Sequence, residues 1–323
     1  MIQSTGPQAR TWARGLAPAL LPVLALVLAA CTGSEAAPDG PPAAGPGPSP
    51  SARPVGTAAP TLPPGPGGRT PVFSHGPRDG DKVVALTFDA DMTPSQAARA
   101  AGGERFDNPV LIRTLRRMRV PATVFMTGRW AEEYPDQARS LGRDPLLEVA
   151  NHSYSHHAFA SPCGRLQSVS PGAMRADVER AYAAIRRAGV PDPLPYVHFP
   201  GGCFDDRALR AVAPVKVTAV QGDVKSGDAF ATSADRVVER VLSRVEPGSV
   251  VSLHCTLSTA PVTDEAVRRI VPELRARGYR FVRVSELIGA GQGAPDPGGT
   301  APAGAGAPGQ GRSEQGQPEQ AVR

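Results

Sequence analysis

Residues 83–91 read Val-Val-Ala-Leu-Thr-Phe-Asp-Ala-Asp. The first six are apolar or β-branched without a break, which is typical of a strand buried on both faces, as in a parallel sheet. Two aspartates, Asp89 and Asp91, follow at once. Residues two apart in extended chain face the same way, so both carboxylates are expected to point into one mouth at the end of this strand.

Short apolar runs and longer helical patterns alternate beyond this stretch. The clearest helix covers 171–188, with Ser170 as N-cap, Pro171 as the first helical residue and Gly189 after its end. Strands are expected at 83–88, 122–127, 146–150, 195–199, 217–222, 249–253 and 279–284, and further helices at 108–119, 130–141, 205–212, 233–245 and 263–277. This alternation predicts an α/β fold, a parallel (β/α) barrel of seven or eight strands.

Proline and glycine are unevenly distributed along the 323 residues. Many of the 36 Pro and 35 Gly fall in two stretches, residues 32–75 and 289–323. These stretches hold too few large apolar side chains to offset the chain entropy lost on ordering. We therefore expect a disordered linker at 31–75, one folded domain at 76–288 and a disordered tail at 289–323.

The N-terminus has the pattern of a secretory signal. Arg10 and Arg14 precede an apolar run that ends at Cys31. The run has about 15 residues, fewer than the ~20 that a membrane-spanning helix needs. Because residues 28–31 (Leu-Ala-Ala-Cys) resemble the lipobox of bacterial lipoproteins, we expect a signal peptide at 1–30, lipidation of Cys31 and an extracytoplasmic protein anchored to the cell membrane. An ordinary signal peptide with a cysteine nearby is the alternative.

Charge and cysteine content narrow the possible partners. The net charge is +5, aromatic residues make up 5%, and no basic run is interleaved with aromatics, so nucleic acid is not expected as a partner. We expect a monomer.

Cys163, Cys203 and Cys255 remain after Cys31, and export permits one disulfide among them, whose pairing the sequence leaves open.

Five of the six histidines lie at or just beyond a predicted strand end, near several aspartates. The carboxyl ends of the strands carry the catalytic groups in (β/α) barrels. His152 and His156 stand four apart, and a helical turn would put both imidazoles on one side. Two histidines and one carboxylate are a common catalytic zinc site, with a second carboxylate as base. An incidental histidine pair on a surface turn would look the same, but Asp89 and Asp91 favour the metal site.

Residues 83–288 resemble the polysaccharide deacetylases of the NodB-homology, carbohydrate esterase family 4 type. That family has five ordered motifs, and each has a counterpart in this chain. The counterparts are Thr87-Phe88-Asp89-Ala90-Asp91, His152-Ser153-Tyr154-Ser155-His156, His198-Phe199-Pro200-Gly201-Gly202, the segment Gly222 to Asp228, and Val250-Val251-Ser252-Leu253-His254. The resemblance implies a distorted barrel of the NodB type.

The resemblance also implies a metal-dependent hydrolase that removes N-acetyl groups from a cell-wall or extracellular polysaccharide, peptidoglycan being the favoured substrate. Asp89 would be the base and His254 the acid, oriented by His198 and Asp228. A divalent metal would be held by Asp91, His152 and His156; zinc is expected, and cobalt, nickel or iron would also fit. Substrate contacts would come from Pro200, Gly201, Gly202 and Leu253.

Three departures from the family pattern bear on these roles. Ala90 stands at the usual metal aspartate, so Asp91 is the expected replacement. Alternatively Asp89 binds the metal while Asp91 or water acts as base, or two histidines and solvent hold it. His198 replaces an arginine, and its charge is conditional near neutral pH; it could also simply cap a loop. Ala229 replaces a tryptophan, for which Phe230 can partly substitute.

Two other functions remain open at the level of sequence. The substitutions at positions 90 and 198 are compatible with an inactive barrel that binds glycan without cleaving it. The same fold could also remove O-acetyl groups from a glycan such as xylan, or hydrolyse a small amide, since ester and amide cleavage share the water-activation step.

Overall fold

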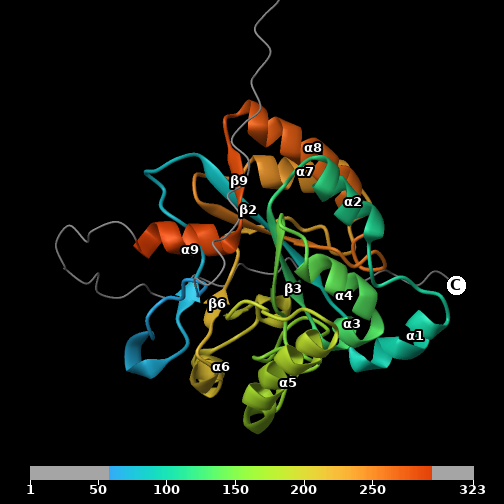
Figure 1. Ribbon diagram of the computed structural model, residues 1–323, viewed down its shortest axis with the longest axis vertical. Helices are drawn as coiled ribbons and strands as arrows, with labels where there is room; N and C mark the ends of the chain where they lie inside the picture. The colour runs from blue at the N-terminus through green and yellow to red at the C-terminus, as the bar shows by residue number, and fades with distance from the viewer. Residues whose placement is uncertain (1–57, 293–323) are drawn as a thin grey trace, which may run out of the picture. The chain divides into compact units, whose positions relative to one another are not determined.

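The computed structural model describes residues 58–292. Its centre is a sheet of nine strands in which every pair is parallel, in the order β1-β6-β5-β4-β3-β2-β8-β7 with β9 also on β2 (Figure 1). The strands are β1 (Val72–Phe73), β2 (Val83–Ala90), β3 (Ala122–Met126), β4 (Leu147–Asn151), β5 (Tyr196–Val197), β6 (Thr218–Val220), β7 (Val224–Lys225), β8 (Ser249–His254) and β9 (Arg280–Val282). The predicted distorted parallel barrel is confirmed. The two strands not predicted, β1 and β7, have two residues each, too few to leave a pattern.

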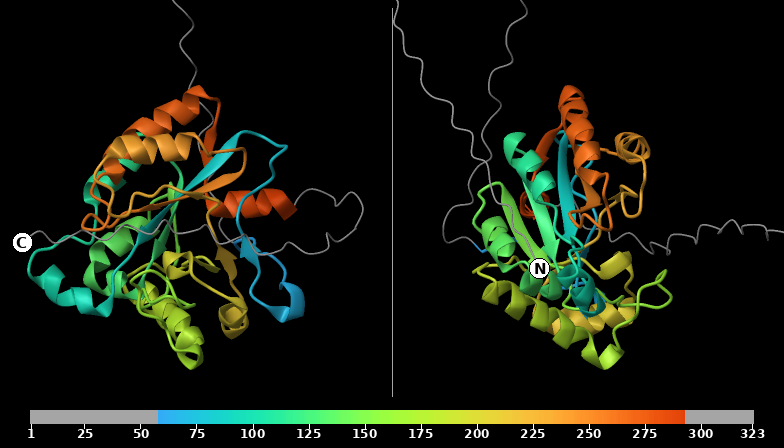
Figure 2. Two further views of the ribbon diagram at one scale, coloured as in Figure 1. Left: turned by 180° about the vertical axis from the view of Figure 1, so that it is seen from behind. Right: turned by 90° about the vertical axis from the view of Figure 1, so that its right-hand side faces the viewer.

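Helices cover the outer face of the sheet, and α7 packs beside α8 while α3 packs against α5 (Figures 1 and 2). The predicted helix at 130–141 is divided, because Pro135 begins a new helix directly after Tyr134. The α-helices are α1 (Ala97–Ala101), α2 (Pro109–Arg117), α3 (Gly128–Glu133), α4 (Pro135–Gly142), α5 (Met174–Arg187), α6 (Asp206–Val212), α7 (Ala234–Leu242), α8 (Thr263–Ala276) and α9 (Val284–Gln292).

The inside of the barrel is filled by an apolar layer with one residue from each of eight strands. These residues are Phe73, Ala85, Phe125, Ala150, Tyr196, Val220, Val250 and Val282. Helix α9 adds Val284, Leu287 and Ile288 to the same cluster. The strands therefore surround a packed core rather than an open channel, and functional groups can lie only beyond this layer.

Helix α9 and the segment before β1 differ from the predicted domain limits. Helix α9 crosses the expected boundary at 288 and continues to Gln292. Residues 58–75, placed in a disordered linker by composition, hold β1, whose Phe73 is buried, and Leu62 packs on the inner cluster. The hydroxyl of Tyr196 donates a hydrogen bond to the carbonyl of Pro60 at 2.7 Å. A few apolar residues among many prolines suffice here, because the barrel interior supplies their partners.

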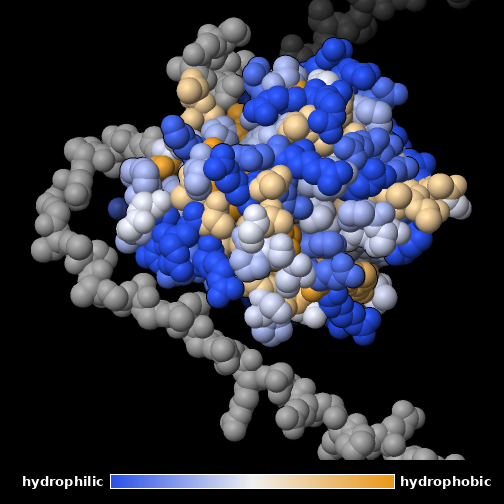
Figure 3. Space-filling view, turned by 90° about the horizontal axis from the view of Figure 1, so that it is seen from below, coloured by the Kyte–Doolittle hydropathy of each residue, from blue (hydrophilic) through white to orange (hydrophobic). Residues whose placement is uncertain are grey.

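Several predictions concern residues beyond the described part. The signal peptide at 1–30, the lipidated Cys31, the linker up to residue 57 and the tail from residue 293 all lie outside the described residues. Within 58–292, no helix combines the length and apolar character that crossing a bilayer requires. The face seen from below is largely hydrophilic, with scattered hydrophobic residues (Figure 3).

The structure resolves the cysteine pairing that the sequence left open. Cys163 and Cys203 form a disulfide, with their Cα atoms 6.0 Å apart, and Cys255 is a buried free thiol. The disulfide joins the loop after β4 to the turn after β5. Both segments lie next to the predicted catalytic residues in sequence.

Candidate active site

The site is the polar layer directly beyond the apolar core of the barrel. Side chains alternate along a strand, so the next inward-facing positions are two and four residues further on. His152 follows Ala150 by two residues and His198 follows Tyr196 by two, while Asp89 and His254 follow Ala85 and Val250 by four. Strands β2, β4, β5 and β8 therefore bring these four groups to one mouth. The turn after β7 adds Asp228, so five strand ends contribute to the site.

These groups line one cavity of about 400 Å³. All seven residues predicted to be catalytic or metal-binding are among its walls, together with Gly201 and Gly202. The seven are Asp89, Asp91, His152, His156, His198, Asp228 and His254. The structure thus brings the seven side chains together around one cavity.

Two predicted substrate contacts are placed elsewhere. Leu253 is fully buried in the outer core between sheet and helices, because it alternates with His254 and so faces away from the mouth. Its predicted substrate contact is wrong. Pro200 is also buried and does not line the cavity.

Asp223, also at a strand end, binds Arg78 at 2.7 Å and the backbone N–H of Val250 at 2.7 Å, so its role is structural.

Asp89 lies at the centre of three imidazoles. Its Oδ2 atom is 3.8 Å from Nε2 of His152, 3.7 Å from Nε2 of His198 and 4.0 Å from Nε2 of His254. Its Oδ1 atom is buried without a hydrogen-bond partner. Burial raises the pKa of Asp89 above its usual value, although His198 and His254 oppose the shift. A buried carboxylate oxygen without a partner is costly in a folded protein and marks a place for a ligand.

The hydrogen bonds of His152 and His198 fix which ring nitrogen faces Asp89. Nδ1 of His152 lies 2.9 Å from the carbonyl oxygen of His198, and Nδ1 of His198 lies 2.7 Å from that of Val220. A carbonyl only accepts, so each Nδ1 carries a proton and each ring turns its Nε2 to the cavity. Burial, with the neighbouring His156 and His198, holds the pKa of His152 well below its usual value.

Asp91 and His156 form the other half of the cavity. Oδ2 of Asp91 is 3.8 Å from Nε2 of His156, and the hydroxyl of Thr256 donates to Oδ1 of Asp91. His156 is not on the expected helical turn. The chain makes an irregular turn in which Ser153 and His156 have φ values of 67° and 55°, and the rings of His152 and His156 still approach to 5.0 Å between centroids.

His254 is held by a fully buried carboxylate. Its Nδ1 donates to Oδ1 of Asp228 at 2.8 Å, and Oδ2 of Asp228 accepts from the backbone N–H of His254 and from the hydroxyl of Thr263, each at 2.7 Å. Burial alone would lower the pKa of His254, but the charge and hydrogen bond of Asp228 outweigh it and raise the pKa to about 10. His254 is therefore protonated at neutral pH and has its Nε2–H directed toward the cavity.

The donor set fits a divalent metal ion. The ligand atoms of Asp89, His152 and His198 all lie within 4.8 Å of one another. Imidazole and carboxylate are ligands of zinc, cobalt, nickel and iron. Within the described residues, the predicted set of Asp91, His152 and His156 does not form such a group. An Asp-His-His group that could hold a metal ion is thus present, with a membership different from the one expected.

Comparison with known proteins agrees with this geometry. The family model for polysaccharide deacetylase matches residues 76–220. A chitooligosaccharide deacetylase from Sinorhizobium fredii is 31% identical over 219 residues, which is 63% of this chain and 91% of the relative. The chain belongs to the polysaccharide deacetylase family. The sequence prediction of a hydrolase of this family is thereby confirmed.

Two further comparisons concern a curated relative and a solved structure. A peptidoglycan-N-acetylglucosamine deacetylase from Bacillus cereus is 26% identical over 206 residues, 64% of this chain and 68% of the relative. The crystal structure of a carbohydrate esterase family 4 pseudoenzyme from Bacillus anthracis has a TM-score of 0.56 at 23% identity, covering 71% of this chain and 70% of the other. The latter likeness supports the shared fold alone.

Sequence reasoning missed several side chains that shape this polysaccharide deacetylase site. Thr256 holds Asp91 and Thr263 holds Asp228, and isolated threonines give no signal in sequence. Ser252 also lines the cavity, and its position two residues before His254 on the same strand could have revealed it. Phe230, considered only as a partial substitute for tryptophan, is 81% exposed at the cavity wall.

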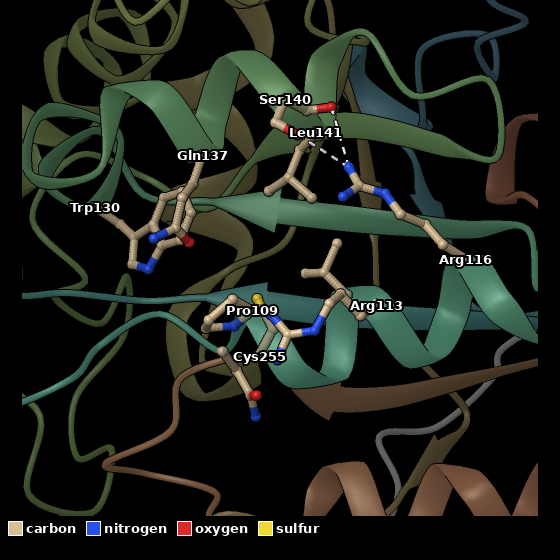
Figure 4. A pocket seen from close by; sticks show the side chains of 10 residues that line it. Pro109, Arg113, Arg116, Trp130, Gln137, Ser140, Leu141 and Cys255 are labelled. Atoms are coloured by element: carbon tan, nitrogen blue, oxygen red, sulfur yellow. Dashed lines mark hydrogen bonds between the residues drawn. The ribbon is translucent and has the colours of Figure 1, made fainter. Parts of the chain in front are cut away.

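A second cavity of about 290 Å³ lies between α2 and α4 (Figure 4). Trp130 and Leu141 give it apolar walls, and Arg116 crosses it to the hydroxyl of Ser140 at 3.0 Å. Cys255 also borders it, but burial raises the pKa of this thiol well above its usual value. The cavity holds neither a carboxylate–imidazole cluster nor a thiol that ionises readily, so it offers no comparable chemistry.

Proposed function

We propose that this protein is a metal-dependent deacetylase that removes N-acetyl groups from an extracellular polysaccharide, with peptidoglycan as the favoured substrate. The observation that carries the proposal is the arrangement around Asp89. Three carboxylates and four imidazoles from five strand ends share one cavity, and three of the imidazoles direct Nε2 at a single carboxylate oxygen.

Different residues of the site would carry out the separate steps of amide hydrolysis. A bound divalent ion would polarise the acetamide carbonyl and acidify a water molecule. His152 with a neighbouring carboxylate and a second imidazole would hold that ion. The carboxylate left outside the ligand set would accept the proton of the attacking water.

The departing amine needs a proton, and His254 can supply it. An amine leaves much less readily than an alcohol when it is not protonated, so amide cleavage depends on an acid at this position. Asp228 keeps His254 charged and fixes its ring so that Nε2 faces the cavity. This pairing favours N-acetyl over O-acetyl substrates, because an ester would not require an acid with so high a pKa.

The polysaccharide and the location follow from two further arguments. Relatives named above act on chitooligosaccharides and on peptidoglycan N-acetylglucosamine, according to their names. The signal peptide and lipidated Cys31 expected from the sequence would place the domain outside the membrane, held by a Pro-rich segment. Peptidoglycan is then the first N-acetylated polymer that the domain would meet.

The test is acetate release from peptidoglycan, chitin oligomers and acetylated xylan. The metal-stripped full-length protein would be assayed alone, with added zinc and with zinc plus chelator. Metal-dependent release from an N-acetylated glycan is expected. Release from xylan alone would favour the esterase, and no release from any substrate by metal-loaded protein would favour an inactive glycan-binding barrel.

A further inference from the structure

We propose that the metal of this protein is held by Asp89, His152 and His198, so that the histidine at the usual arginine position is a metal ligand. The inference rests on the metal dependence in the proposed function and deepens it. In the proposed ligand set, Asp89 and His198 stand in place of Asp91 and His156, which the sequence had predicted as ligands.

The first argument is distance. Nε2 of His152 and Nε2 of His198 lie 3.8 Å and 3.7 Å from the same Oδ2 atom of Asp89. Ligands about 2.0–2.2 Å from a tetrahedral ion lie roughly 3.3–3.5 Å from one another, so small side-chain movements would complete the coordination. All three groups are buried, with 5%, 1% and 7% exposure for Asp89, His152 and His198.

The second argument is orientation. The Nδ1 atoms of both histidines donate to backbone carbonyls, those of His198 and Val220. Metal-bound histidines usually anchor the second ring nitrogen in this way, which fixes the tautomer and aims the lone pair. The two rings are also nearly parallel, with 21° between their planes and 5.2 Å between centroids.

The third argument is that an orienting role does not account for His198. An orienting partner would donate a hydrogen bond from Nε2 to Asp89, but Nε2 of His198 is 3.7 Å from Oδ2 of Asp89, beyond hydrogen-bond distance. Nδ1 of His198 is committed to the carbonyl of Val220, so Nε2 is the ring nitrogen left to bind a ligand. A cation between the two atoms satisfies both, and Oδ1 of Asp89 still lacks any other partner.

The assignment leaves Asp91 outside the ligand set. The cavity has two other carboxylates: Asp228, which is paired with His254, and Asp91, which lies 3.8 Å from His156. Asp91 would then be the group available to accept the proton of the attacking water. Asp89→Asn and Asp91→Asn are therefore a matched pair: the first should abolish zinc binding, and the second should abolish acetate release while zinc remains bound.

Zinc affinity of the metal-stripped full-length protein, measured by competition with a chromophoric chelator, tests the ligand set directly. His198→Gln and His198→Arg are expected to weaken zinc binding about 100-fold or more, whereas His156→Gln, the same substitution at the neighbouring histidine, should stay within about tenfold. Arginine is the decisive replacement, because it could orient a carboxylate but cannot bind zinc.

Two results would overturn the assignment: His198→Arg keeping wild-type zinc affinity, or His156→Gln weakening it more than His198→Gln does. Circular dichroism of the metal-free variants establishes that each is folded, and His198→Gln decides if the bulkier arginine is not tolerated. The titration needs no substrate. A wild-type protein that binds zinc as expected but releases no acetate would therefore contradict the proposed function and leave the ligand set standing.

Discussion

Nδ1 of His254 lies 2.8 Å from Oδ1 of Asp228, and this carboxylate is almost completely buried. Asp228 belongs to the fourth motif of the family and His254 to the fifth, and the two residues lie at the ends of the neighbouring strands β7 and β8. Burial opposes the charged imidazole, yet the charge of Asp228 raises the pKa of His254 to about 10. His254, the proposed acid, is therefore charged at neutral pH because Asp228 lies beside it.

Asp228→Asn should move the alkaline limb of the activity profile to lower pH. Without the negative charge the pKa of His254 falls, so the proton needed by the amine is lost earlier as pH rises. We expect the alkaline limb of kcat/KM for acetate release to shift down, and kcat at pH 8 to fall on the order of 10²-fold. Thr263→Val, which removes a hydrogen bond and keeps the charge, should shift it less. An unchanged alkaline limb in Asp228→Asn would mean that His254 is not the proton donor.

Phe230→Ala should weaken substrate binding more than chemistry. Phe230 exposes 81% of its surface at the cavity wall, and a bound sugar would cover part of its ring. Losing that contact is expected to cost about 1 kcal/mol, a roughly fivefold rise in KM with kcat little changed. Phe230→Tyr keeps the ring and should behave as wild type. Equal KM values for the alanine and tyrosine variants on oligomeric substrate would exclude this contact.

Removing the Cys163–Cys203 disulfide should destabilise the fold and loosen one side of the site. The two cysteines are 40 residues apart in sequence, and closing a loop of this size stabilises a protein by about 2–4 kcal/mol. The double alanine variant should unfold at lower denaturant concentration. Cys255→Ser removes a buried free thiol that forms no disulfide. Adding reductant should lower the midpoint for wild type and Cys255→Ser alike and leave the double variant unchanged.

Asp107 should stabilise the fold only above the pH at which it protonates. Burial alone would raise its pKa, but hydrogen bonds from Arg105 and Gln137 outweigh burial and lower it. Its contribution is thus fully present above the unfolded pKa of about 4 and is lost as pH falls through the lower folded pKa. Asp107→Asn should cost about 2 kcal/mol at pH 7. The difference in free energy of unfolding between the two proteins should shrink below pH 4; a constant difference would contradict the assignment.

The sequence predicted the barrel and the seven converging residues because both depend on local patterns. Buried strands are recognised by runs of apolar residues. Side chains alternate between the two faces of a strand, so Asp89, four residues after the inward-facing Ala85, also faces inward at the end of β2. The membership of the metal group depends instead on contacts between distant segments. The anchoring of His198 by the carbonyl of Val220 and of Asp91 by Thr256 joins residues 22 and 165 positions apart, and no single-chain pattern encodes such pairs.

Ala90→Asp should not rebuild a metal site, although it restores the residue usual at this position in the family. Ala90 is fully buried and packs in the outer core with Leu86 and Phe88, because it alternates with Asp89 and faces the helices. A carboxylate there would be buried without a partner, at a cost of about 3 kcal/mol. We expect lower thermal stability and unchanged zinc affinity. The smaller, uncharged Ala90→Ser should lose less stability, and a gain in zinc affinity from Ala90→Asp would show that the end of β2 can rotate residue 90 into the cavity.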